Sequence, residues 1–567
     1  MALKVVQSRS SRTLFNACAA AFLDEAGVHV GPAQHPAQLW LTHRNQRDLL
    51  LTEAVRRGLG GWLNPPIHFF SALPELFGVR AKPIGLLARR ELISRIGHEA
   101  GKPFGINVGN ADASITRGHM LDSLLGELLA EGVAPNVLEH ALAEVPGDAF
   151  AARRNAWVVA SYDTYLSELQ EIGVYDPRAI HALVAARIDA GGLPGALGNA
   201  RRLHIYGLYS ARARGRLLDA LRRQADVEVI VYTTSGAADL AACADSTEAL
   251  PAVDSSLIVQ PAPDANRELQ WVAREVKKLL LSGAAEPHEI AVVARTGRED
   301  TRRALYALER AGVPATARTR TPLSEISALK ALLDLFRASA ERWSYRVLRS
   351  VLASPYFRTR IDLRPFDHIA SQARPATLLA WEGELACLAA ALESEDPDLE
   401  TRRLGLNPNR VRRDLKLFQG VRALLEPLAG EKSLGQWLEL TRALLRESWF
   451  RFRQRICDPP EERRDIVRLD QRGVRMLERL LDDWSKIDDA AEVFSPTEWF
   501  RALRALLEGQ ELVLTTPGQK GVQVLEAHDA ALMPFHTTFL VHANDGEFPR
   551  LPATTGVFSD EERRGLL

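Results

Sequence analysis

Apolar and polar residues follow two kinds of pattern along this chain. Short apolar runs bounded by polar loops are typical of buried strands in a parallel sheet, and they occur at residues 3–6, 39–42, 67–70, 203–206, 227–232, 290–294, 522–525 and 538–541. Between them, residues 85–191 and 345–509 repeat apolar positions with a period near 3.6, which is typical of amphipathic helices. We therefore predict an α/β fold in which long helical stretches interrupt the sheets.

The middle of the chain marks a boundary. Residues 236–263 are rich in Ala, Asp and Pro and carry no clear period, so we predict a linker there. A long amphipathic helix over 266–283 follows, and then a strand that ends in Arg295. The strands before the linker should share one parallel sheet, and those after it should share another.

Composition narrows the class of protein. With 567 residues, 46% hydrophobic and 25% charged, the chain has the composition of a soluble globular protein. No segment approaches the roughly 20 apolar residues of a membrane span, and the first residues lack the apolar centre of a signal peptide, so we expect a cytoplasmic protein with no membrane partner. A net charge of −1 requires any nucleic-acid site to be a local patch.

The cysteines argue against a metal or redox site. Cys18, Cys243, Cys387 and Cys457 lie far apart in sequence, so no Cys-x-x-Cys spacing exists. We expect buried, reduced thiols and no metal ligands.

The first strand leads into a loop where a phosphate-binding loop would stand. A working P-loop needs glycines to wrap the phosphates and a lysine before Ser or Thr. This loop instead carries Ser10, Ser11, Arg12 and Thr13, without glycine or lysine. The sequence predicts a degenerate nucleotide site.

Two stretches are candidates for contact with nucleic acid. Arg44 and Asn45 lie in a basic loop between a strand and a helix, where the alternative is an ordinary connection kept charged for solubility. In the stretch 446–455, Arg451 and Arg453 interleave with Trp449, Phe450 and Phe452, and aromatic rings can stack on bases while arginines bind phosphates. On a helix, however, Trp449, Phe452 and Ile456 fall near one face, which favours a core stripe.

The stretch 521–550 carries a family resemblance. Its order is strand, polar loop, strand and then Asp-Gly-Glu-Phe-Pro, which resembles the fifth motif region of UvrD-type superfamily 1 helicases. Active members carry T-x-H-x-x-K-G in the loop, whereas this chain reads E-A-H-D-A-A-L. His528 is kept, while Glu526, Ala531 and Leu532 replace the Thr, Lys and Gly. The helix over 266–283, the strand ending in Arg295 and the residues 557–564 resemble the same family.

In order along the chain, these features resemble the AddB/RexB-type subunit of bacterial ATP-dependent helicase–nucleases, an inactivated helicase fold. The resemblance implies two RecA-like parallel-sheet domains, each with a large all-helical insertion. The domains are 1–84 with 197–260 and 261–344 with 510–567, and the insertions are 85–196 and 345–509. It also implies that Gly207 and Leu208 stand where an active motor has Asp-Glu for Mg²⁺, and that Arg295 faces the nucleotide site. The family's PD-(D/E)XK nuclease domain with cluster-binding cysteines is not in this sequence, which is therefore a fragment or a short version.

The expected function follows from that resemblance. We expect a non-catalytic, DNA-binding scaffold in double-strand-break processing, which guides single-stranded DNA beside an AddA-like motor–nuclease subunit. No cofactor is expected on this chain, because ATP and Mg²⁺ would bind the partner. The nucleic-acid-binding candidates are Arg44, Asn45, His528, Arg451 and Arg453. Two alternatives remain open, namely an ATP-dependent helicase with an atypical phosphate loop and a purely protein-binding helical scaffold.

Overall fold

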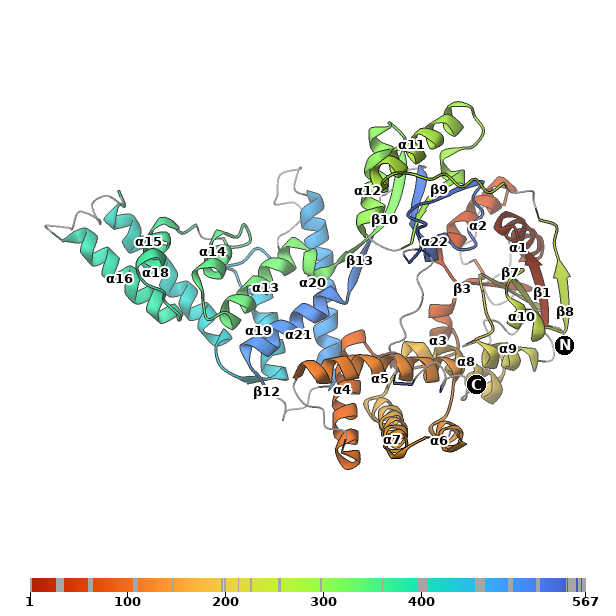
Figure 1. Cartoon of the computed structure of the whole chain (residues 1–567), viewed down its shortest axis with the longest axis horizontal. Coiled ribbons are helices and arrows are strands. Elements are labelled where there is room, and N and C mark those ends of the chain that lie inside the picture. Colours follow the sequence, from red (N-terminus) through yellow and green to blue (C-terminus); the bar gives the residue numbers. More distant parts are fainter. Residues whose placement is uncertain are drawn as a thin grey trace. The chain divides into compact units, whose positions relative to one another are not determined.

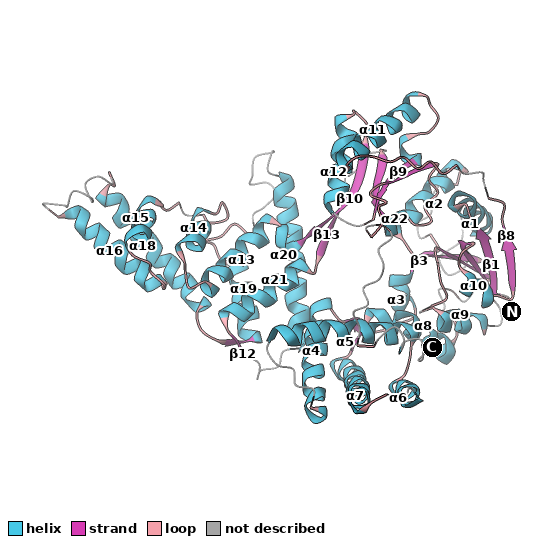
Figure 2. Cartoon of the chain, in the orientation of Figure 1, coloured by secondary structure: helices cyan, strands magenta, loops and turns pink. Residues whose placement is uncertain are grey.

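The structure is a computed structural model, and most of the chain is described in it. Residues 3–562 are described apart from the segments 27–34, 60–64, 106–110, 145–146, 195–196, 198–199, 225–226, 253–255, 296–297, 395–404, 454–463, 488–492, 516–520, 549–556 and 559–561 and the single residues 213, 359 and 547. The chain divides into two compact units. The first comprises 1–84, 89–319 and 515–567, and the second comprises 85–88 and 320–514. The first unit holds the parallel sheets, and the second is mainly helical (Figures 1 and 2).

The first sheet contains every strand predicted for the first half. Its order is β3-β2-β6-β7-β1-β8, and all neighbouring strands are parallel. The strands are β1 (Leu3–Ser8), β2 (Ala37–Leu41), β3 (Ile67–Phe69), β6 (Arg202–Tyr206), β7 (Glu228–Thr234) and β8 (Ser246–Ala249). The prediction of one shared parallel sheet is confirmed. The predicted linker is corrected, because β8 and the short helix α10 (Ala238–Ala242) lie within 236–263.

Helices cover both faces of this sheet. Helices α1 (Ser11–Ala26) and α2 (Arg44–Arg56) share an apolar cluster with one face. The other face packs against α3 (Leu73–Leu76), α8 (Ile180–Gly191), α9 (Gly215–Arg222) and α10. A parallel sheet covered on both faces explains why its strands read as continuous apolar runs. Helix α8, which the sequence placed with the helical insertion, packs on the sheet through Val184 and Ile188.

The second sheet contains the strands predicted for the second half. Its order is β13-β10-β14-β9-β15, and the pairs β10–β14, β14–β9 and β9–β15 are parallel. The strands are β9 (Ile290–Ala294), β10 (Ala315–Pro322), β13 (Glu511–Thr515), β14 (Val522–Glu526) and β15 (Thr537–Leu540). Helices α11 (Ala265–Leu281) and α12 (Arg298–Arg310) share one apolar cluster with it. Gly521 directly precedes β14, and only glycine fits there because a Cβ would lie 2.7 Å from the carbonyl oxygen of Pro314.

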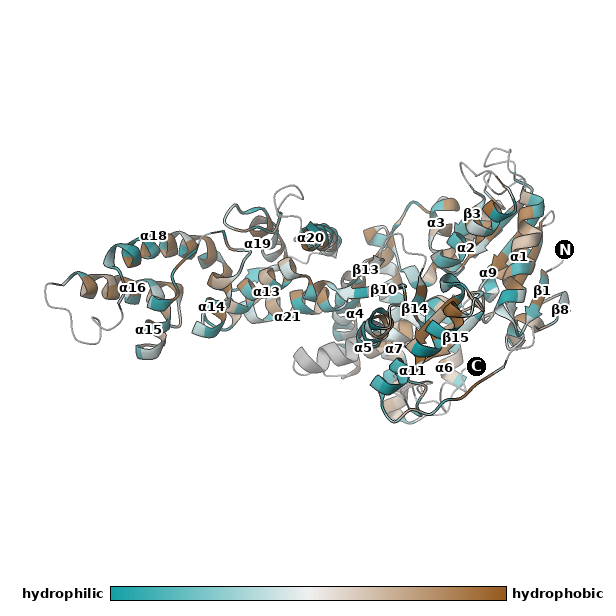
Figure 3. Ribbon diagram, turned by 90° about the horizontal axis from the view of Figure 1, so that it is seen from above, coloured by the Kyte–Doolittle hydropathy of each residue, from teal (hydrophilic) through white to brown (hydrophobic). Residues whose placement is uncertain are grey.

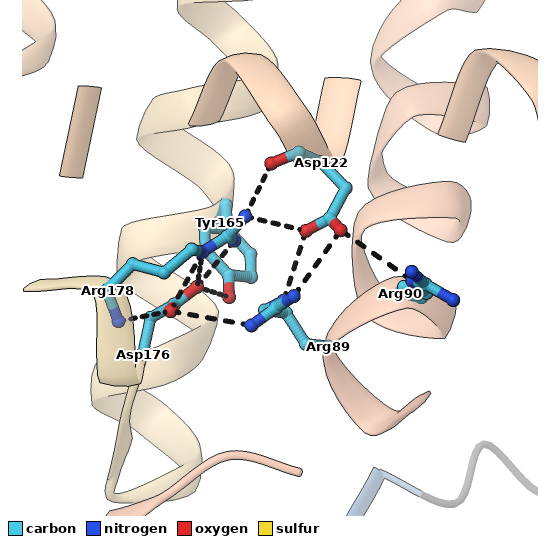
Figure 4. A network of polar contacts seen from close by, with 6 residues as sticks. All are labelled: Arg89, Arg90, Asp122, Tyr165, Asp176 and Arg178. Atoms are coloured by element: carbon cyan, nitrogen blue, oxygen red, sulfur yellow. Dashed lines mark hydrogen bonds and ion pairs between the residues drawn. The ribbon is translucent and has the colours of Figure 1, made fainter. Parts of the chain in front are cut away.

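A buried ionic network joins helices of the first helical insertion to the segment that follows them (Figure 4). Its helices are α4 (Leu86–Gly101), α5 (Ala111–Glu131), α6 (Pro135–Glu144) and α7 (Ala149–Ile172), and the short pair β4 (Lys82–Pro83) and β5 (Val174–Tyr175) joins its two ends. Arg178 lies 2.7 Å from Asp176 and 2.9 Å from Asp122, and Arg89 lies 3.0 Å from Asp122. Burial opposes ionisation of Asp176, but the hydrogen bonds and charge of Arg178 outweigh it and lower the pKa of Asp176. Each buried charge here therefore has a partner.

The second unit is organised around an aromatic core. Its helices show separate hydrophobic and hydrophilic faces (Figure 3), and they are α13 (Ser327–Ala340), α14 (Tyr345–Ala353), α15 (Arg364–Gln372), α16 (Leu378–Glu393), α18 (Pro408–Leu425), α19 (Leu434–Arg446), α20 (Arg464–Trp484) and α21 (Pro496–Glu508). The Trp499 ring stacks on Trp437 at 5.7 Å and on Trp484 at 5.3 Å between centroids. A two-residue pair, β11 (Lys432–Ser433) with β12 (Val493–Phe494), lies beside these helices. No described helix is long and apolar enough to span a bilayer.

The helix predicted over 446–455 is wrong. Helix α19 ends at Arg446, and the next residues are irregular and bridge to Phe357 through Phe450. Phe450 and Phe452 are buried while Arg451 and Arg453 are exposed, which is a period of two. The Trp449 ring stacks on Phe357 at 6.0 Å and covers Gly420, where any Cβ would lie 2.8 Å from the ring. Ile456 lies outside the described residues.

Replacing Trp449 should therefore affect stability rather than DNA binding. We expect Trp449→Ala to lower the free energy of unfolding of the second unit by about 2–4 kcal/mol, because a ring that packs on Phe357 and Gly420 is removed. Urea denaturation would measure the loss, with Leu379→Ala as the control because Leu379 is an exposed residue of α16 in the same unit. A Trp449→Ala protein with unchanged stability but weakened single-strand binding would instead place the site in this segment.

Candidate functional site

The loop in the P-loop position caps its own helix. The hydroxyl of Ser10 accepts a hydrogen bond from the backbone N–H of Thr13 at 3.1 Å, and the hydroxyl of Ser8 accepts one from the N–H of Ser10 at 3.1 Å. Unsatisfied N–H groups at a helix N-terminus are what bind a phosphate in a P-loop. At Thr13 this group is already satisfied by a side chain of the chain itself.

The neighbouring residues of this loop contact the second half of the same unit. The hydroxyl of Ser11 donates to the carbonyl oxygen of Met533 at 3.0 Å, and the Arg12 guanidinium lies 3.6 Å from the Glu289 carboxylate. Glu289 directly precedes β9, and Met533 lies between β14 and β15, so both partners belong to the second sheet and its loops. The degenerate loop thus makes intramolecular contacts where a P-loop would present its groups to a nucleotide.

The position expected to hold a pair of acids carries Gly207, which is tightly packed against Thr42, and the buried Leu208. Gly207 has φ +101°, and a Cβ there would overlap the hydroxyl of Thr42. The side chain of Leu208 is buried in the apolar cluster on the α8 and α9 face of the sheet. Neither residue offers an oxygen ligand for Mg²⁺ at the end of β6.

The loop after β14 reaches across to the first sheet. Leu532 has φ +56°, a conformation that glycine adopts at no steric cost and in which leucine is strained. Its side chain is buried in the cluster that contains Leu14 and Phe15 of α1. The hydroxyl of Tyr206 donates to the carbonyl oxygen of Leu532 at 2.6 Å. The backbone at Leu532 thus has the shape of a glycine turn, while the side chain is docked against α1.

His528 lies just before this turn, on the short helix α22 (Ala527–Ala530). Its Nδ1 lies 3.5 Å from Glu526 and its Nε2 lies 3.6 Å from Asp529, and the side chain is about half exposed. These three residues are the one group in the described part of the chain whose ligand atoms are close enough to hold a metal ion, all within 4.8 Å of one another. The side chains of Glu526 and Asp529 are 11% and 9% exposed, so the histidine is the exposed member of the group.

A cavity of about 1930 Å³ brings several of the predicted residues together. Ser10, Ser11, Arg12 and Arg295 all line it, together with the strand β15 and residues 256–265. Arg295 follows β9, is half-buried, and accepts a hydrogen bond through its carbonyl oxygen from the N–H of Ala527 at 3.4 Å. Thr13 is not among the lining residues.

The acidic side of this cavity was not predicted from the sequence. The backbone N–H of His542 donates to Glu268 at 2.9 Å, and its ring nitrogens lie 3.4 Å from Glu268 and from Asp300. His542 also has φ +56°. Because Glu268 and His542 are 274 residues apart, no local motif announces this contact. The carboxylates offset the arginines, so the cavity as a whole is not basic.

The other predicted nucleic-acid contacts are found in both units of the chain. Arg44 begins α2, and its side chain lies outside the described residues, whereas Asn45 is half-buried in the same turn. Arg451 and Arg453 belong to the second unit, where Arg453 pairs with Glu478. Arg44, Asn45 and His528 belong to the first unit.

A further basic group lies after β6, at the start of α9. Arg214 is the N-cap residue without a side-chain cap, and its Nε is buried without a hydrogen-bond partner among the described atoms. Burial lowers the pKa of Arg214, and burial together with the Arg214 charge lowers the pKa of His181 to about 4. Tyr209, in the same loop, is 42% exposed. The sequence analysis did not single out this group, although the arginines at 212, 214 and 216 after β6 are a signal that could have indicated it.

Comparison with known proteins adds no relative. No family model and no curated protein matches the chain.

The strained turn at Leu532 gives a test of the site's construction. We expect Leu532→Gly to be more stable than Leu532→Ala by about 0.5–1 kcal/mol, because both lose the buried side chain but only glycine relieves the left-handed backbone. Both should be less stable than the wild type by about 1–4 kcal/mol. Denaturant unfolding measures the order, which is the reverse of the usual one for Ala and Gly. A less stable Gly variant would contradict the strained turn.

Proposed function

We propose that the chain is a non-catalytic, helicase-like scaffold that binds single-stranded DNA in a double-strand-break-processing helicase–nuclease. Its two sheets correspond to two RecA-like domains. An AddA-like subunit supplies the motor, with ATP and Mg²⁺, and supplies nuclease activity. The complex acts in the cytoplasm.

The observation that carries the proposal is the contact between the degenerate loop and the loop after β14. Leu532 is buried beside α1, and the hydroxyls of Tyr206 and Ser11 bond to consecutive carbonyl oxygens at Leu532 and Met533. A motor must open and close such a junction as nucleotide binds and leaves. An apolar side chain with two hydrogen bonds favours a fixed junction, which suits a scaffold.

The same contact argues against an ATPase with an atypical phosphate loop. A Mg–triphosphate needs a lysine and acidic ligands as counter-charges, and the corresponding positions are held by Ser10, Ser11, Arg12, Gly207 and Leu208. The hydroxyl of Ser10 already caps the helix. Backbone N–H groups alone can hold a simple anion, so binding of phosphate near Ser10 remains compatible with the proposal.

The DNA-binding part rests on the loops that follow the strands of the first sheet. Arg214 contributes a half-buried guanidinium whose Nε has no hydrogen-bond partner among the described atoms, and guanidinium groups bind phosphate. Tyr209 adds an exposed ring in the same loop, and such rings stack on unpaired bases. Asn45 lies in the first turn of α2, the helix that follows β2, and β2 is the strand next to β6. A scaffold that binds only protein has no need for this arrangement.

The purified chain should not turn over ATP. We expect no hydrolysis above background and no stimulation by single-stranded DNA, since the catalytic counter-charges are missing. A coupled ATPase assay measures this on the wild type and on Arg12→Ala and Arg295→Ala. Hydrolysis that co-purifies with the chain and falls in either variant would support the helicase alternative.

Single-strand binding should be weak, local and salt-dependent. We expect Arg214→Gln and Arg44→Ala each to weaken binding and to reduce the slope of log K against log salt by about 0.7, the share of one phosphate contact. Fluorescence anisotropy with a labelled oligonucleotide over a fourfold range of salt measures both quantities.

The control for this experiment is Arg187→Gln, since Arg187 is an exposed arginine on α8 of the same unit. It should change neither affinity nor slope. A wild-type protein without salt-dependent binding would favour the protein-binding scaffold, and unchanged values for Arg214→Gln would remove this loop from the DNA site.

A further inference from the structure

Strand β15 ends the second sheet with an open edge. It pairs with β9 on one side and is the last strand in the order. An edge strand presents unpaired N–H and C=O groups, which are a template for another strand. The open edge of β15 faces the large cavity, because residues 535–540 line it.

Helix α11 has the position of a crossover helix that lacks its first strand. The Trp271 ring packs edge-on against Phe539 of β15 at 6.3 Å, while Val272 and Val276 share the apolar cluster of β9. Helix α11 therefore covers β15 and leads into β9. A strand that preceded α11 in a βαβ unit would lie on the far side of β15, at the open edge.

The next crossover connection in the same sheet determines the hand of this arrangement. Strand β9 leads through α12 to β10, which lies beyond β14. Helices α11 and α12 share one apolar cluster with the sheet. A strand at the open edge of β15 would connect through α11 to β9 in the same direction and over the same face. Both crossovers then have the same hand, as the chirality of such connections requires.

The residues before α11 have the composition of a buried strand. Leu257, Ile258 and Val259 are 90%, 77% and 82% exposed. Three adjacent aliphatic residues at this exposure are unusual for a loop, whereas such a run is typical of a parallel strand covered on both faces. They lie along the connection between β8 and α11 (Figure 3) and line the same cavity as β15. Only four residues separate Val259 from Asp264, the N-cap of α11, which is an ordinary length for a strand-to-helix loop.

We propose that residues 256–260 form a strap that closes onto β15 as a sixth, parallel strand of the second sheet. The structure holds this strap in its open position. Closure buries the three aliphatic side chains, pairs the free edge of β15 and fills the part of the cavity between them. The strap thereby controls access from this side to Arg12 and Arg295. This inference does not rest on the proposed function.

Hydrogen exchange on the full chain tests the strap. We expect slowed exchange of backbone amides within 257–260 and 538–540 in the wild type. In Ile258→Asp both segments should exchange at least tenfold faster, because a charged side chain cannot be buried between the covering layers. The matched control is Leu281→Asp, since Leu281 is 80% exposed at the end of α11 and lies outside the strap. It should leave both segments unchanged.

Two outcomes would overturn the strap. The first is exchange of residues 257–260 at the rate of an unstructured peptide in the wild type. The second is protection of residues 538–540 that does not change in Ile258→Asp, because the edge of β15 would then be covered by something else. Residue 258 is exposed in the open form, so Ile258→Asp should fold normally, and circular dichroism verifies this.

Discussion

The arrangement of the first unit depends on one apolar side chain that crosses from one sheet to the other. Leu532 leaves the second sheet on a left-handed turn and is buried beside α1 on the first. Tyr206 and Ser11 bond to the carbonyl oxygens of Leu532 and Met533 on either side of it. Groups from both sheets of the first unit therefore meet at one junction.

Two groups of charged residues in the first unit are balanced by opposite charges. In the first insertion, Arg89 and Arg178 share Asp122 and Asp176, so the buried charges are paired. The cavity beside the degenerate loop likewise sets carboxylates against arginines. Arg214 differs, because its buried Nε has no partner in the described part of the chain. With a net charge of −1, an anionic ligand would be recognised by such local exceptions rather than by a long-range field.

The strands that were predicted correctly from the sequence are those whose burial produces a recognisable run of apolar residues. The strands β1, β2, β6, β7, β9 and β14 were found because buried parallel strands are apolar along most of their length, and β15 was found from a shorter apolar run although its residues alternate in exposure. Sequence reasoning failed at β8, whose Ser-Thr-Glu-Ala is fully exposed and has no apolar signal. It also took the aromatic spacing around Phe450 for a helix, although alternating burial of Phe450 and Phe452 fits an extended chain. Burial was expected for all the cysteines, but Cys243 and Cys387 are exposed. Contacts such as His542 with Glu268 join residues too distant in sequence to leave any pattern.

The left-handed turn at Leu532 is coupled to the burial of its side chain. A leucine in the left-handed region costs about 1–2 kcal/mol of backbone strain. Burial of its side chain returns about 1.5–3 kcal/mol, but only while the loop is docked against α1. If the loop swung away, the side chain would be exposed and the strain would remain. On the other side of the junction, the hydroxyl of Ser10 accepts a hydrogen bond from the N–H of Thr13 and so caps α1. The docked position of the loop is therefore favoured by the buried side chain of Leu532 and by the hydrogen bonds that Tyr206 and Ser11 donate to it.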